Sequence, residues 1–117
     1  MSDLKSTWPS CEWLTYAQVA ERLGVEVKTV RQLVRDGGLL GRGGDDPQRI
    51  PADLLPGGVI SKYLRGVISV LRDGGFSDDE ALRWLLEQDE SLGGAPAWAL
   101  HHDLHREVTR RAQAMAF

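Results

Sequence analysis

Apolar residues recur at helical spacing after Thr15, where the sequence predicts a first short helix. Thr15 and Gln18 have the spacing of a capping box, in which each side chain bonds the other residue's backbone N–H. The inward stripe of this helix consists of Val19, Ala20 and Leu23. Gly24 is expected to end it, because glycine enters the left-handed conformation at low cost. Val25 is expected to plug the corner that follows.

A second short helix is predicted from about Val27 to Asp36, and two glycines after it provide the stop signal. Its buried face comprises Val27, Val30, Leu33 and Val34. The polar residues at i, i+3, i+4 and i+7 share the opposite face, and they are Lys28, Arg31, Gln32 and Arg35. The alternation of apolar and polar positions alone fits any amphipathic surface helix equally well.

Residues 39–51 contain two short extended pieces around a Gly/Asp/Pro turn, which predicts a small β-hairpin. Arg42 and Arg49 are expected on its two arms. The segment "PADLL" that follows resembles the start of a helical turn with proline at its first position.

The remainder of the chain has helical periodicity. One helix is predicted over residues 59–71. Ser77 and Glu80 form a second capping box, which opens a helix that reaches about Gln88. A last helix is predicted over residues 96–114. Its apolar stripe is Leu100, Leu104 and Val108.

Composition narrows the class of protein. The chain has 117 residues, of which 42% are hydrophobic, and this suits one compact domain with a packed core. Trp84 and Trp98 are interpreted as core anchors. The one cysteine, Cys11, excludes an internal disulfide and a cysteine-based metal cage. The sequence shows no signal peptide and no apolar run of membrane-spanning length, so a cytoplasmic protein is expected.

The distribution of charge matters more than its total. A net charge of −3 and a pI near 5.5 argue against a generally basic, nonspecific nucleic-acid binder. Between residues 26 and 49 there are five basic and four acidic residues, but the basic ones fall on one helix face and two hairpin arms. Two helices joined by a tight corner follow the helix-turn-helix plan, whose second helix enters the DNA major groove.

This plan assigns a role to each polar residue of the second helix and of the hairpin. Arg31, Gln32 and Arg35 have the planar, multi-donor side chains that contact base edges. Lys28 and Thr29 suit phosphate contacts near the helix start. Arg42 and Arg49 are expected to touch the DNA backbone or minor groove from the wing. Acidic residues in the wing oppose deep insertion, so modest affinity with strong salt dependence is expected.

The stretch "LTYAQVAERLGVEVKTVRQLVRDGGLL" resembles the MerR/excisionase type of winged helix-turn-helix. The matching residues are Thr15, Leu23, Gly24, Val25, Thr29, Val30, Arg31, Arg35, Gly37, Leu39 and Leu40. The rest of the chain, ending "VTRRAQAMAF", resembles a small actinobacterial family of DNA-binding regulators that carry this unit and C-terminal helices. Together the two resemblances cover nearly the whole chain, and they imply this fold and DNA binding.

The sequence departs from the MerR pattern in three ways. Glu26 stands where such proteins often have a serine cap, and glutamate caps poorly. The run "RDGGLL" has one glycine more than the usual spacing. There is no room for a long dimerising helix or an effector domain, so no ligand-sensing role follows.

Other motifs carry less weight. His101 and His105 are four residues apart, but a third metal ligand is missing, so no metal site or cofactor is predicted. Arg106, Arg110 and Arg111 either extend the basic surface or pair with the acids of residues 78–90, and pairing is slightly favoured. Ser6, Thr7 and Ser10 are candidate phosphorylation sites for a Ser/Thr protein kinase, although a solvated tail is the simpler interpretation.

These observations predict a mainly α fold, a winged helix-turn-helix with one small β-hairpin and a C-terminal helical extension. Residues 1–12 would form a flexible tail, 13–57 the DNA-binding unit, and 58–117 an extension packed on it as one domain.

The predicted function is sequence-specific binding of double-stranded DNA in transcriptional regulation. A monomer is favoured, and pairing on a palindromic site stays open. The alternative is a protein-interaction module that uses the acidic 78–90 surface. No catalytic constellation is present, so an enzyme is not expected.

Overall fold

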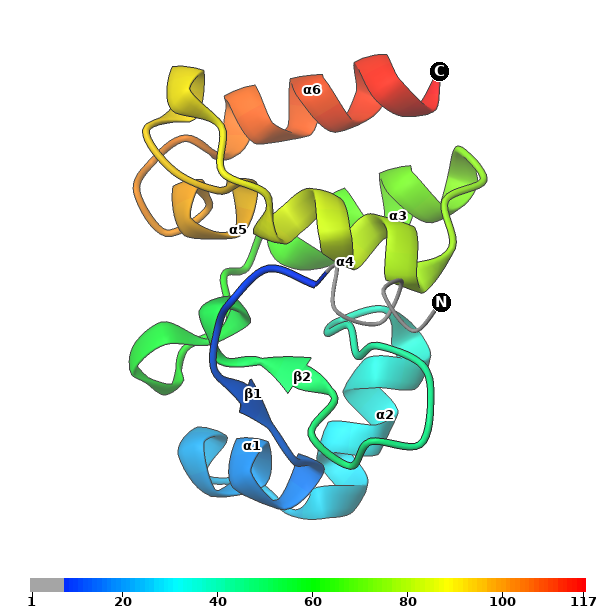
Figure 1. Cartoon of the computed structure of the whole chain (residues 1–117), viewed down its shortest axis with the longest axis vertical. Helices are drawn as coiled ribbons and strands as arrows, with labels where there is room; N and C mark the ends of the chain where they lie inside the picture. The colour runs from blue at the N-terminus through cyan, green and yellow to red at the C-terminus, as the bar shows by residue number, and fades with distance from the viewer. Residues whose placement is uncertain (1–7) are drawn as a thin grey trace.

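The computed structural model describes residues 8–117. Two short helices and a small sheet form one half of the molecule, and the C-terminal helices lie across the other half (Figure 1). The elements are β1 (Trp13–Leu14), α1 (Tyr16–Leu23), α2 (Val27–Asp36), β2 (Ile50–Pro51), the 3-10 turns η2 (Ala52–Leu54) and η3 (Pro56–Gly58), α3 (Leu64–Asp73), α4 (Asp78–Leu86), η4 (Glu90–Leu92), α5 (Pro96–Ala99) and α6 (His105–Ala116). The mainly helical winged helix-turn-helix with C-terminal helices is therefore confirmed.

Short-range signals set the ends of α1 and α2. The Thr15 hydroxyl accepts a hydrogen bond from the Gln18 backbone N–H at 3.1 Å, and the Gln18 side chain accepts one from the Thr15 N–H at 2.8 Å. Gly24 ends α1 with φ 73°, and Gly37 ends α2 with φ 82°. Both backbones are left-handed, which explains the glycines. Val25 does not plug the corner as predicted, because its side chain is 39% exposed.

The small antiparallel sheet is built from a different pair of segments than the sequence suggested. Leu14 of β1 lies opposite Ile50 of β2, so the first strand precedes α1 and does not come from residues 39–42. Leu39 and Leu40 are fully buried and anchor that end of the loop in the core. Residues 41–49 form the wing, an irregular loop in which the Arg42 N–H donates to the Arg49 carbonyl at 2.9 Å.

The C-terminal helices start and stop at points set by tertiary contacts. Helix α3 begins five residues later than predicted, at Leu64. Ser61 holds the preceding segment as a turn, because its hydroxyl accepts from the Tyr63 N–H and donates to the Leu100 carbonyl. The Ser77–Glu80 capping box opens α4 as predicted, but α4 ends at Leu86 and does not reach residue 88.

The predicted helix over residues 96–114 is wrong, because the chain forms two helices there. Helix α5 ends at Ala99, and α6 starts at His105. Between them, Asp103 adopts a φ of 62°, which a continuous helix does not permit. Leu100 is buried on one side of the break and Val108 on the other, so the turn lets both reach the core.

A single cluster of buried apolar residues joins the two halves, from Leu14 and Val30 to Ile68 and Val108. Helix α6 lies along α3 at the edge of the molecule (Figure 1).

Residues 8–12 do not behave as the predicted tail, because Trp8 and Cys11 pack against the core cluster. Among residues 8–117, no helix is long and apolar enough to cross a membrane.

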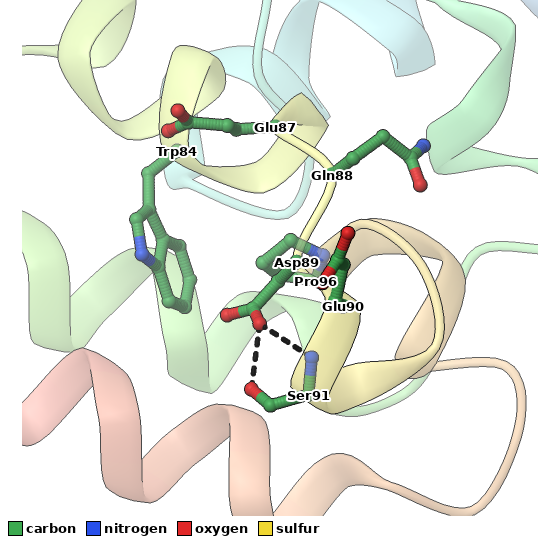
Figure 2. Close-up of a pocket in the computed structure, with 7 residues that line it drawn as sticks. All are labelled: Trp84, Glu87, Gln88, Asp89, Glu90, Ser91 and Pro96. Carbon is green, nitrogen blue, oxygen red and sulfur yellow. Dashed lines mark hydrogen bonds between the residues drawn. The ribbon is translucent and has the colours of Figure 1, made fainter.

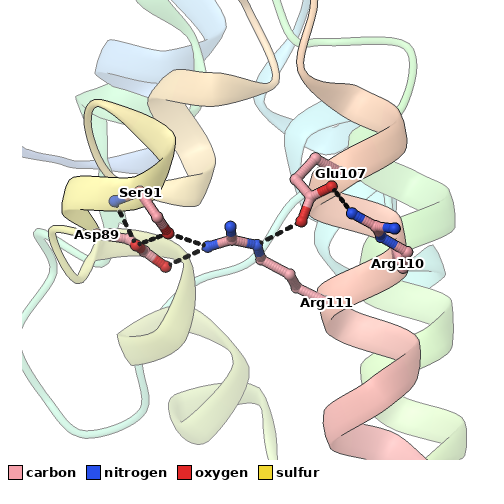
Figure 3. Close-up of polar contacts among 5 residues, drawn as sticks. All are labelled: Asp89, Ser91, Glu107, Arg110 and Arg111. Atoms are coloured by element: carbon pink, nitrogen blue, oxygen red, sulfur yellow. Dashed lines mark hydrogen bonds and ion pairs between the residues drawn. The ribbon is translucent and has the colours of Figure 1, made fainter.

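Arg111 bridges α6 to the η4 turn by an ion pair (Figure 3). Its Nη1 lies 2.6 Å from the Asp89 carboxylate, and its Nε lies 2.8 Å from Glu107 on its own helix. Arg110 also pairs with Glu107. The predicted pairing with the acids of residues 78–90 is thus present for Arg111, whereas Arg110 pairs within α6.

Candidate nucleic-acid interface

The polar face of α2 is open to solvent. Its exposed residues are Lys28, Arg31, Gln32 and Arg35, as the periodicity predicted, and also Thr29. On the opposite side, Val30 is fully buried and fixes the helix in the core. In Figure 1, α1 and α2 lie at one end of the molecule, and α3 to α6 gather at the other end. The C-terminal helices therefore leave this face uncovered.

Several of these side chains already interact with each other. The Gln32 amide nitrogen donates to both carboxylate oxygens of Asp36 at 2.9 and 3.0 Å, and the Gln32 amide oxygen accepts from Arg35. Lys28 pairs loosely with Glu26 at 3.5 Å. Within the described part of the chain, Arg31 has neither a hydrogen-bond nor an ion-pair partner. Such exposed helix pairs are worth only about 0.2–0.5 kcal/mol, so a ligand can replace them.

The N-terminal end of α2 has no side-chain cap. Glu26 has the extended backbone of an N-cap residue, but its side chain accepts no cap hydrogen bond. Its carbonyl oxygen accepts from the N–H groups of Thr29 and Val30. The first N–H groups of the helix, at Val27 and Lys28, therefore point outward without a side-chain acceptor among the described residues. This confirms that glutamate caps poorly at this position.

Two arginines of α3 cover the other end of α2. The Arg65 guanidinium donates to the Asp36 carbonyl at 3.0 Å. A Cβ atom added at Gly37 would lie 2.8 Å from Arg72 Nη1, and a Cβ atom added at Gly38 would lie even closer to the Arg65 guanidinium. The Gly37–Gly38 pair therefore permits two guanidinium groups to approach the negative end of the helix dipole.

The two arginines of the wing bind atoms of the wing itself. The Arg42 side chain is only 15% exposed. Its Nη2 pairs with Asp46 at 3.0 Å, its Nε donates to the Gln48 carbonyl at 3.0 Å, and its guanidinium lies 3.9 Å from the centre of the Trp13 ring. Arg49 donates to the carbonyl of residue 44. The charge of Arg42 is thus largely neutralised where it lies.

Arg31 and Arg49 meet at one shallow hollow between α1, α2 and the wing. The hollow is lined by Thr15, Tyr16, Ala17, Val27, Arg31, Pro47 and Arg49. Sequence reasoning missed Tyr16, which lines this hollow together with the two arginines and carries a phenol that can donate a hydrogen bond. The only signal for it was its position beside the Thr15 cap, at the first residue of α1.

The other candidates from the sequence separate in the structure. His101 lies in the turn after α5, and the His105 ring stacks on Tyr63 with centroids 3.6 Å apart. No group of three metal-binding side chains is found among residues 8–117. Trp98 is not the predicted core anchor, since it is 41% exposed and stacks on His102. Ser10 is exposed, while Ser6 and Thr7 lie outside the described residues.

The acidic surface of residues 78–90 is largely engaged. Asp78 pairs with Arg72, Asp89 pairs with Arg111, and Glu80 completes the Ser77 capping box. Asp79 accepts a hydrogen bond from the Gly43 backbone N–H. The C-terminal part of this surface borders a hollow, shown in Figure 2, that is lined by Trp84, Glu87, Gln88, Asp89, Glu90, Ser91 and Pro96.

Comparison with known proteins identifies two matching family models. The winged helix-turn-helix domain of DNA-binding protein Rv2175c matches residues 6–55, and the Rv2175c C-terminal domain, described as of unknown function, matches residues 61–116. The DNA-binding protein Rv2175c of Mycobacterium tuberculosis (strain ATCC 25618 / H37Rv) is 39% identical over 113 residues, which cover 86% of this chain and 77% of that protein. This chain belongs to the Rv2175c family.

The fold comparison agrees with this membership. An NMR structure of Rv2175c superposes with a TM-score of 0.81 at 37% identity, covering 93% of this chain and 84% of that chain. The first Rv2175c model contains α1, α2 and the wing, and the second contains α3 to α6. The polar face of α2 and the hollow beside Arg49 therefore belong to the winged helix-turn-helix part of the Rv2175c-family fold.

Proposed function

We propose that this Rv2175c-family chain binds double-stranded DNA with sequence preference and acts as a transcriptional regulator. The observation that carries the proposal is the uncovered polar face of α2, with Arg31 free of intramolecular partners among the described residues. The docking mode is the one that the MerR/excisionase resemblance implies, with α2 in the major groove. The family's winged helix-turn-helix model and the relative's name support DNA as the partner.

Base reading is assigned to Arg31, Gln32 and Arg35. Arginine can donate two hydrogen bonds to guanine O6 and N7, and glutamine can pair with adenine N6 and N7. Gln32 must release Asp36 to do so, and this exchange is inexpensive because both groups are exposed. Arg31 needs no such exchange, so it is the first residue to test.

Backbone contacts come from both sides of the groove. Lys28, Thr29 and the uncapped N–H groups at the start of α2 suit one phosphate. Arg49 and Tyr16 suit another at the hollow they share with Arg31. Arg42 supports the wing from within and does not contact DNA, because its guanidinium is held by Trp13 and acceptors of the wing.

The rival proposal, a protein-interaction module on the acidic 78–90 surface, is less well supported. Four of its acids are engaged in intramolecular contacts, by Arg72, Arg111, the Ser77 cap and the Gly43 backbone N–H. We expect the chain to bind DNA as a monomer, with pairing on a palindromic site as the other arrangement. A Ser/Thr kinase acting near Ser10 would add negative charge and weaken binding to phosphates.

Fluorescence anisotropy with mixed-sequence duplex DNA tests the proposal. Affinity should fall linearly with salt on a log–log plot, with a slope near −0.9 for each phosphate contacted. On a preferred site selected from random duplexes, Arg31→Ala should weaken binding by about 1–3 kcal/mol, the cost of one lost bidentate base contact.

Arg106→Ala is the matched control. Arg106 is an exposed cation on α6, away from α2, and its substitution also changes the net charge by one. It should leave affinity nearly unchanged. Equal affinities for wild type and Arg31→Ala would reject the site assignment, and salt-independent binding would reject DNA as the partner.

A further inference from the structure

Helix α4 of the C-terminal part reaches the wing through the carboxylate of Asp79. The Gly43 backbone N–H donates to Asp79 Oδ1 at 2.9 Å. This hydrogen bond joins two segments that are 36 residues apart in the sequence. It is thus a direct link from the domain of unknown function to the loop proposed to approach DNA.

The same face of α4 makes a second contact toward the wing. Arg83 lies one helical turn after Asp79, so the two side chains project in the same direction. The Arg83 guanidinium lies 4.3 Å from the centre of the Trp8 ring, and Trp8 packs edge-to-face on Trp13 at 5.3 Å. The other neighbour of Trp13 is the Arg42 guanidinium. A continuous series of guanidinium–ring and ring–ring contacts therefore runs from α4 to the base of the wing.

Such support matters because the wing has little backbone hydrogen bonding, although the side chains of Arg42, Asp46 and Arg49 bind it from within. It contains Gly41, Gly43 and Gly44, and one backbone hydrogen bond, between Arg42 and Arg49, closes it. Gly43 has no side chain that could pack, so Asp79 holds this residue through its backbone N–H. Glycine-rich loops lose the most conformational freedom on ordering.

We propose that Asp79 is a positioning residue, which fixes the wing in the conformation that meets DNA. The C-terminal domain then acts in DNA binding without touching DNA. This inference rests on the proposed function, but its structural part, the restraint on Gly43, can be measured on the free protein.

Two substitutions at Asp79 separate positioning from charge. Removing a carboxylate near a DNA interface should strengthen binding if the carboxylate acts only by repelling phosphates. Asp79→Ala removes both the charge and the acceptor for Gly43, and we expect affinity to fall roughly three- to tenfold, the usual worth of one hydrogen bond. Asp79→Asn removes the charge but keeps an oxygen acceptor, so its affinity should equal or exceed that of wild type.

Matched controls address charge and folding. Glu87→Ala removes one exposed carboxylate from the end of the same helix without touching the wing, and should not weaken binding. Asp79 also lies in the first turn of α4, where a negative charge favours the helix, but Asp79→Asn loses this effect as well. Thermal unfolding of both variants reports any shared loss of stability.

Amide hydrogen exchange of Gly43, measured by NMR without DNA, tests the restraint itself. Exchange should accelerate about tenfold or more in Asp79→Ala and stay near the wild-type rate in Asp79→Asn. Unchanged exchange in Asp79→Ala would overturn the inference, as would equal or tighter DNA binding by that variant. If no form of the protein binds DNA, the proposed function fails, while the exchange result still decides whether Asp79 restrains the wing.

Discussion

Alanine substitution at two glycines should change stability in opposite directions. Gly24 ends α1 at φ 73° and ψ 34°, and a Cβ atom added there meets no heavy atom within 4 Å. Gly66 lies inside α3 with an ordinary helical φ, and it also has open space within 4 Å. Because neither substitution creates a clash, the backbone conformation alone decides the sign of the effect.

The magnitudes follow from this difference. A left-handed backbone costs an L-residue about 1–2 kcal/mol, and alanine recovers part of this by restricting the unfolded chain, so Gly24→Ala should lower the free energy of unfolding by about 1 kcal/mol. Gly66→Ala should raise it by roughly 0.5–1 kcal/mol, because alanine is the better helix former. Urea unfolding followed by tryptophan fluorescence measures both, with m-values compared to verify the two-state analysis. Effects of the same sign in the two variants would refute the reasoning.

Two further predictions concern the C-terminal helices. The pKa of Asp89 is lowered first by hydrogen bonds from the Ser91 hydroxyl and backbone N–H and then by Arg111, and the pKa of Glu107 is lowered by hydrogen bonds from Arg111 and Arg110 (Figure 3). Both carboxylates therefore stabilise the fold above the ordinary carboxyl pKa near 4, and this contribution is lost as the pH falls through their lower folded pKa values. Asp89→Asn should make the urea midpoint of unfolding less sensitive to pH between about 4 and 2. An unchanged dependence of the midpoint on pH would contradict this prediction. Ser77→Ala should lower the free energy of unfolding by about 1 kcal/mol, because α4 loses its N-terminal cap, and Ser77→Asp should restore most of this stability. Equal stability of the wild type and both variants in urea would show that the cap is dispensable.

The features that the sequence predicted correctly depend on neighbouring residues. Each capping box joins groups three residues apart, as in the Thr15–Gln18 pair, and needs no other part of the chain. The left-handed helix ends at Gly24 and Gly37 likewise depend on the local backbone. For this reason the bounds of α2 and the exposed face it carries could be predicted, since helical periodicity alone places them.

Features that depend on distant residues could not be found in this way. The partner of Ile50 in the sheet is Leu14, and the 39–51 segment contains no signal for that choice. The break between α5 and α6 falls at Asp103, where neither glycine nor proline marks it. Trp98 is a large apolar residue in an apolar stretch, yet its ring lies against the glycines at residues 93 and 94 and stays 41% exposed.

The wing shows why counting charges along the sequence is a poor guide to an interface. In the sequence, Arg42 and Arg49 are equivalent basic residues beside one turn. In the fold, Arg42 is enclosed by Trp13, Asp46 and the Gln48 carbonyl, whereas Arg49 lines the same hollow as Arg31. A guanidinium that is paired within the protein and cannot reach a phosphate releases no counterions from DNA, so we expect Arg42 to add little to the salt dependence of binding. Under the proposed function, Arg31 and Arg49 would therefore carry the electrostatic contact, and Arg42 would shape the loop that holds Arg49.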